Sequence, residues 1–136
     1  MKILKLIILF LTIIFSNSTL FAQKNEEQII QAIAFETNKI VLNNKHAYNY
    51  TKEGNNFIIL NLSNKEIIKG EITSIGDGKF SSIITFLPSG KQFSNKKIIG
   101  RNDLIFVFAK YNIIKEDFSI DETRLSSFIE NYNELK

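Results

Sequence analysis

The sequence contains no cysteine and no tryptophan, and it has one histidine and one proline. The missing cysteine excludes disulfide bonds, cysteine nucleophiles and thiolate ligands for zinc. Small secreted domains in general are often held together by disulfides, so this chain has to rely on packed side chains instead. Its 12 phenylalanines and 4 tyrosines supply much of the apolar mass for such packing.

The scarcity of histidine limits the enzyme classes to which the chain can belong. A serine triad would have to use His46 as its base, and the sequence has no Gly-x-Ser-x-Gly element around a serine. Histidine clusters for zinc and repeated acids for calcium are also missing. The run Gly76-Asp77-Gly78-Lys79 has too few glycines for a phosphate-binding loop and suits a turn between two strands. We therefore expect no catalytic triad, no metal and no cofactor.

Carboxylates are the catalytic groups that the chain has in quantity. Glycosidase chemistry needs two of them at a set separation in a cleft. Glu66 and Glu71 have opposite parity in one expected strand, while Glu116 and Asp117 lie in a connection. The pattern brings no two of these acids together, so a hydrolase that uses carboxylates or His46 is an alternative and not the main interpretation.

Arginine is rare as well, since Arg101 and Arg124 are the two in the chain. Nucleic-acid binders usually carry a basic face and an excess of Lys and Arg. The net charge of +3 includes Lys2 and Lys5 near the start, so the rest of the chain is close to neutral. These features argue against nucleic acid as a partner. Basic residues gather at 91–110 and acidic ones at 116–136, which predicts mutual attraction or ordinary solvation.

The first 22 residues have the build of a secretory signal peptide. Lys2 and Lys5 form a basic start, an apolar stretch follows over 6–15, and Ala22 is a small residue before Gln23. That stretch is about half of the roughly 20 residues that a membrane span needs. We therefore expect cleavage between Ala22 and Gln23, no stable membrane insertion afterwards, and a mature protein in a bacterial periplasm or outside the cell.

Residues 23–136 are long enough for a single domain with its own core. This domain is expected to begin with a helix over about 26–38. Asn25 can cap that helix, and two acids and Gln28 come directly after Asn25. The apolar residues that come next are close to helical spacing.

From 46 to 111 the chain alternates short apolar runs with turn residues, which is typical of an antiparallel meander. The turns hold Gly, Asn, Asp and Pro, which either accept positive φ or favour tight turns. The expected strands are His46–Thr51, Phe57–Leu62, Glu66–Ile75, Lys79–Leu87, a weaker Gln92–Ile99, and Leu104–Tyr111.

The C-terminal segment predicts a second helix. Ser119-Ile120-Asp121-Glu122 matches a capping box, and apolar residues recur at helical spacing from Leu125 to Tyr132. The expected fold class is α+β, with an N-terminal helix, an antiparallel β-meander of five to six strands, and a C-terminal amphipathic helix packed on the sheet. Several strands are apolar on both faces, so a small closed β-barrel capped by the C-terminal helix is the alternative.

A candidate binding surface combines three side chains that alternate along one expected strand with three basic side chains of a later hairpin. Such a surface suits an acidic partner or an anionic glycan. We expect a non-enzymatic binding or interaction domain whose partner is a protein or another envelope component. The alternative is a carrier that holds a small apolar ligand in a curved sheet. The surface consists of His46, Tyr48, Tyr50, Lys96, Lys97 and Arg101.

Overall fold

The computed structural model describes residues 27–135. The expected leader with its cleavage point at Ala22 and Gln23 lies outside the described residues. The elements, in chain order, are β1 (Ile33–Glu36), β2 (Lys39–Leu42), β3 (Lys45–Glu53), β4 (Asn56–Leu60), β5 (Glu66–Gly76), β6 (Lys79–Phe86), β7 (Lys91–Phe93), α2 (Arg101–Lys110) and α3 (Glu122–Tyr132).

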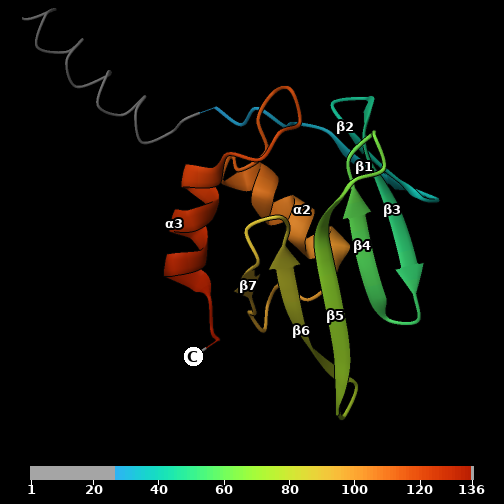
Figure 1. Cartoon of the computed structure of the whole chain (residues 1–136), viewed down its shortest axis with the longest axis vertical. Coiled ribbons are helices and arrows are strands. Elements are labelled where there is room, and N and C mark those ends of the chain that lie inside the picture. Colours follow the sequence, from blue (N-terminus) through green and yellow to red (C-terminus); the bar gives the residue numbers. More distant parts are fainter. Residues whose placement is uncertain (1–26, 136) are drawn as a thin grey trace, which may run out of the picture.

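The strands form one antiparallel sheet in which each pairs with its neighbours in sequence, in the order β1-β2-β3-β4-β5-β6-β7 (Figure 1). The α+β class and the meander are therefore confirmed. The sheet has seven strands instead of five or six. It is also open, because β1 and β7 do not pair with each other in the described sheet, so the alternative of a closed barrel is wrong.

Asparagine and aspartate supply much of the left-handed backbone that the hairpins require. Asn43 and Asn44, between β2 and β3, have φ values of 52° and 64°, and Asp77 and Gly78, between β5 and β6, have 55° and 71°. Two consecutive positive-φ residues make a tight turn whose twist matches that of the flanking strands. These residues thus reverse the chain without splaying the sheet.

The expected strand over 104–111 is wrong, because residues 104–110 belong to helix α2 and Tyr111 is its C-cap. Its buried residues recur at helical spacing, whereas Phe106 is 52% exposed. The buried residues are Leu104, Ile105, Phe108 and Ala109. A short continuous apolar run does not distinguish a strand from a buried helix by periodicity alone. Asp103 in the first turn and Lys110 in the last turn complement the helix dipole and are the local signal for a helix.

The helix expected over 26–38 is also wrong within the described residues. Residues 27–32 form no regular element and Ile33–Glu36 is the edge strand β1. The Asn43 side chain accepts hydrogen bonds from the backbone N–H groups of Gln31 and Ala32, at 2.8 and 3.2 Å. Asn112 accepts another from the N–H of Ile29 at 3.0 Å. These hydrogen bonds to side chains compete with the backbone hydrogen bonds that a helix would need. The segment also buries Ile30 in the core.

One face of the sheet is covered by α2, and α3 packs beside α2 and β7 (Figure 1). Phe108 of α2 lies 5.8 Å from Phe86 of β6, measured between ring centroids. Phe128 of α3 lies 5.0 Å from Phe93 of β7 and 6.0 Å from Phe108. These four rings pack together in the hydrophobic core between the sheet and the helices.

The C-terminal helix forms as expected, but it begins at Glu122 and its N-cap is Asp121. The Asp121 carboxylate accepts a hydrogen bond from the N–H of Arg124 at 3.0 Å. Leu125 and Phe128 are the buried residues of the helix. Of the helices described between residues 27 and 135, none is long and apolar enough to cross a membrane.

Candidate binding groove

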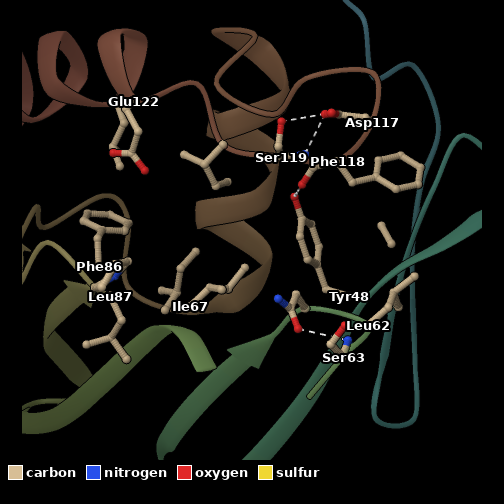
Figure 2. A pocket seen from close by; sticks show the side chains of 16 residues that line it. Tyr48, Leu62, Ser63, Ile67, Phe86, Leu87, Asp117, Phe118, Ser119 and Glu122 are labelled. Atoms are coloured by element: carbon tan, nitrogen blue, oxygen red, sulfur yellow. Dashed lines mark hydrogen bonds between the residues drawn. The ribbon is translucent and has the colours of Figure 1, made fainter. Parts of the chain in front are cut away.

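A groove of about 520 Å³ lies at one end of the sheet. We call it the apolar groove. Its walls come from β3, from the β4–β5 connection with the start of β5, from residues 86–88, and from the connection between α2 and α3 with the start of α3. Figure 2 shows these segments facing one another across the groove, with Ile67 and Leu87 on the sheet side and Glu122 on the helix side.

Two β-bulges shape the sheet side of this groove. In β3, Val41 pairs with His46 and Ile40 with Tyr48, so Ala47 is an extra residue. In β5, Ile59 pairs with Ile68 while Leu60 pairs with Glu66, which leaves an extra residue at position 67. A bulge bends the strand and redirects side chains. The extra residue and its successor in each strand line the groove: Ala47, Tyr48, Ile67 and Ile68.

Tyr48 holds the loop that closes one side of the groove. Its hydroxyl donates a hydrogen bond to the backbone carbonyl of Phe118 (Figure 2). Burial, and secondarily the negative charge of Asp117, raise the pKa of Tyr48 well above its ordinary value. The phenol therefore stays protonated, and its hydroxyl is engaged inside the protein.

Asp117 and Glu122 place carboxylates at the edge of the groove. Asp117 accepts hydrogen bonds from the hydroxyl and the N–H of Ser119, at 2.5 and 3.0 Å. These bonds lower the pKa of Asp117 below its ordinary value, so it is ionised at neutral pH. Figure 2 shows Glu122, the first residue of α3, pointing from the helix toward Phe86. Both acids are exposed to solvent.

The rest of the groove is mainly apolar, and its buried polar groups are satisfied internally. The half-buried side chain of Asn61 is also engaged, since its Oδ1 accepts hydrogen bonds from the backbone N–H groups of Ser63 and Lys65, both at 2.9 Å. Among the described residues, every buried side-chain nitrogen or oxygen has a hydrogen-bond partner. A ligand in this groove would therefore meet apolar side chains, including Leu62 and Phe86, with exposed carboxylates at the edge.

The structure separates the residues of the sequence-based candidate surface. At the bulge around Ala47, His46 is exposed and Tyr48 is buried. The Nε2 atom of His46 lies 2.8 Å from the side-chain oxygen of Asn49. Tyr50 instead meets Arg101, whose guanidinium carbon lies 3.9 Å from the centre of the Tyr50 ring. The same guanidinium lies 4.8 Å from the ring centre of Phe35, so it is held between two aromatic rings.

Lys96 and Lys97 lie elsewhere, exposed in the connection between β7 and α2 at the side of a second hollow. Tyr48 instead lines the apolar groove, and Tyr50 and Arg101 line a third hollow. Leu62 and Glu122 are groove residues that the sequence does not predict, and Asp117 stands out in the sequence only as a carboxylate in a connection. No local pattern marks them, because the groove depends on two bulges that sequence periodicity does not reveal.

No group of three or more His, Asp or Glu side chains that could hold a metal ion occurs in the described range 27–135. Comparison with known proteins gives no match: no protein-family model, no curated protein sequence and no solved structure is significantly similar to this chain.

Proposed function

We propose that this protein is an exported, non-enzymatic binding protein and that the apolar groove holds a small amphipathic ligand with an apolar chain and a positively charged end. The observation that carries this proposal is the combination of an apolar groove of about 520 Å³ with two exposed carboxylates at its edge. Proposed export rests on the basic start, the short apolar stretch and the small residue Ala22 in the sequence.

The size and lining of the groove support an apolar ligand. Small-molecule sites typically measure about 300–1,000 Å³ and are lined mostly by apolar side chains with a few polar groups. Burying each methylene of a ligand contributes roughly 0.8 kcal/mol. An alkyl chain lying against Ile67, Phe86 and Leu87 would gain this energy without displacing any internal hydrogen bond.

The charges at the groove edge support a cationic end group over an anionic one. Asp117 stays ionised because Ser119 donates two hydrogen bonds to it. Glu122 adds a second carboxylate at the start of α3. An ammonium group near these oxygens would gain Coulomb attraction, whereas a carboxylate there would be repelled.

The environment of Asp117 does not suit the general acid of a carboxylate-based hydrolase. A glycosidase acid needs a pKa raised by an apolar pocket, so that it is protonated at neutral pH. The pKa of Asp117 is instead lowered, and its carboxylate faces solvent. These properties suit a fixed negative charge that attracts a cation.

Calorimetric titration with three ligands of equal chain length tests the proposal. Decylammonium should bind more tightly than decanol, and decanol more tightly than decanoate. In the double variant Asp117→Asn/Glu122→Gln, the preference for decylammonium over decanol should fall at least fivefold. The matched control Glu53→Gln/Asp77→Asn changes one Glu and one Asp that are exposed at other turns, and it should keep the preference.

A second pair of variants tests the apolar wall. Leu62 at the groove and Ile75 at the far end of β5 are 52% and 62% exposed, so neither is needed for the core. Leu62→Gln should weaken decanol binding at least threefold, and Ile75→Gln should leave it unchanged. Equal binding of all three ligands, or equal effects of the two substitutions, would contradict the proposal.

A further inference from the structure

A second groove, separate from the apolar one, lies at the opposite end of α3. It measures about 500 Å³ and is formed by residues 95–98, the end of α2 and the last turn of α3. We call it the lysine groove. Glu122 and Leu125 of α3 line the apolar groove, whereas Phe128 and Tyr132 line the lysine groove. The two grooves share no lining residue, so an inference about this one does not depend on the other.

Three aromatic rings form one wall of the lysine groove. The ring centroid of Tyr132 lies 5.7 Å from that of Tyr111 and 5.2 Å from that of Phe128. Phe128 is buried, but Tyr111 and Tyr132 are 39% and 41% exposed. Their hydroxyl oxygens lie 3.2 Å apart. The wall thus offers apolar ring faces together with a pair of hydroxyl groups.

Three lysines surround these rings. Lys96 and Lys97 come from the β7–α2 connection, and Lys110 comes from the last turn of α2. The Lys110 ammonium lies 5.7 Å from the ring centre of Tyr111. Among the described residues, no carboxylate forms a salt bridge with any of the three ammonium groups. Glu134 is the acid in the lining, so positive charges outnumber negative ones.

Backbone groups along the groove are already hydrogen-bonded within the protein. The N–H of Lys96 donates to the Glu134 carboxylate at 2.6 Å, and the N–H of Lys97 donates to the Asn95 side chain at 2.9 Å. The Asn95 amide donates to the backbone carbonyl of Tyr132 at 2.9 Å. A peptide that binds by strand addition needs free backbone partners of this kind, and these ones are occupied.

We propose that the lysine groove binds an acidic glycan, a chain of sugar residues that carry carboxylate or sulfate groups. Sugar rings have apolar C–H faces that can lie on the tyrosine rings and hydroxyl groups that can bond the tyrosine hydroxyls. The ammonium groups of Lys96, Lys97 and Lys110 then pair with the acidic groups as flexible point charges. Such pairing at an exposed site weakens as salt rises.

Calorimetry with hexagalacturonate as the probe tests this assignment, with neutral maltohexaose and hexaglutamate for comparison. Hexagalacturonate should bind at least tenfold more tightly than maltohexaose at 20 mM salt, and this advantage should shrink at 500 mM. The triple variant Lys96→Gln/Lys97→Gln/Lys110→Gln should weaken hexagalacturonate binding at least tenfold. The control Lys39→Gln/Lys45→Gln/Lys79→Gln removes three exposed lysines of the sheet and should bind like the wild type.

The variant Tyr132→Leu tests the aromatic wall and should weaken hexagalacturonate binding at least fivefold. The urea midpoint of unfolding of this variant shows whether it is still folded. Equal binding of maltohexaose, or wild-type affinity in the triple variant, would overturn the proposal. Binding of hexaglutamate without binding of hexagalacturonate would also overturn it and would assign the groove to an acidic peptide. Where a variant is unstable, hexagalacturonate binding by the wild-type protein that is unchanged between 20 and 500 mM salt would still overturn the proposal.

Discussion

Tyr48 is the residue on which the shape of the apolar groove depends most directly. It lies beside the bulge at Ala47, it is buried, and its hydroxyl bonds the carbonyl of Phe118 in the connection between α2 and α3. The alternation of His46, Tyr48 and Tyr50 in the sequence predicts one shared face. The extra residue in β3 breaks that alternation, because a bulge shifts the parity of every side chain that precedes it.

Tyr48→Phe should lower the free energy of unfolding by about 1–2 kcal/mol at pH 8, because the carbonyl of Phe118 loses its partner. The effect should shrink at alkaline pH. Since the pKa of Tyr48 is raised in the folded protein, its stabilising effect is complete below the unfolded value of about 10 and is lost as the pH rises above it. Urea denaturation at pH 8 and pH 11 measures both values. A difference between wild type and variant that stays constant over this range would contradict the account.

Among the elements, the meander strands and the C-terminal helix were predictable from sequence, whereas α2 and the first hairpin were not. Turn residues such as Asp77 and Gly78 mark strand ends locally. The N-terminal segment instead depends on Asn43 and Asn112, whose side chains bind backbone groups of residues 29–32 from distant positions. Such long-range hydrogen bonds leave no periodic signal in the sequence.

The pairing of β4 with β5 contains a close contact that can be tested. Gly70 lies opposite Phe57, and a Cβ atom added at Gly70 would lie 2.1 Å from Cε1 of the Phe57 ring. Gly70→Ala should therefore cost about 1–3 kcal/mol through overpacking. In the double variant with Phe57→Leu, the cost should be smaller than the sum of the single costs. Gly100→Ala is the control for steric overlap, because an added Cβ meets nothing within 4 Å there. Its cost should come only from weaker capping of α2, whose N-cap is Gly100. Additive costs in chemical denaturation would show that the ring and the glycine are not coupled.

Helix α3 should be part of the core and not a detachable tail. Phe128 packs against Phe93, Phe108, Tyr111 and Tyr132. Phe128→Ala should therefore cost about 3–5 kcal/mol. Phe106→Ala removes a ring of the same size that is 52% exposed in α2, and its cost should be clearly smaller. If the two variants unfold at the same denaturant concentration, α3 is not core.

At the scale of the whole molecule, α3 separates two grooves of different charge. The apolar groove at its start has Asp117 and Glu122 at the edge. The lysine groove at its end has three lysines that form no salt bridge with a carboxylate of residues 27–135. Sequence composition predicts the separation of basic and acidic segments along the chain. It does not predict the grooves, because both depend on how α3 and its preceding connection pack on the sheet.

The most direct test of the proposed binding function is a two-dimensional ¹H–¹⁵N NMR titration of the protein with decylammonium. The amide signals of residues 61–63, 67, 68 and 117–122, which line or flank the apolar groove, should shift progressively and saturate. Signals from 95–98 and 128–132 at the lysine groove should remain in place. Shifts that are absent, or that spread over the exposed face of the sheet without saturating, would contradict the assignment of the apolar groove as the binding site.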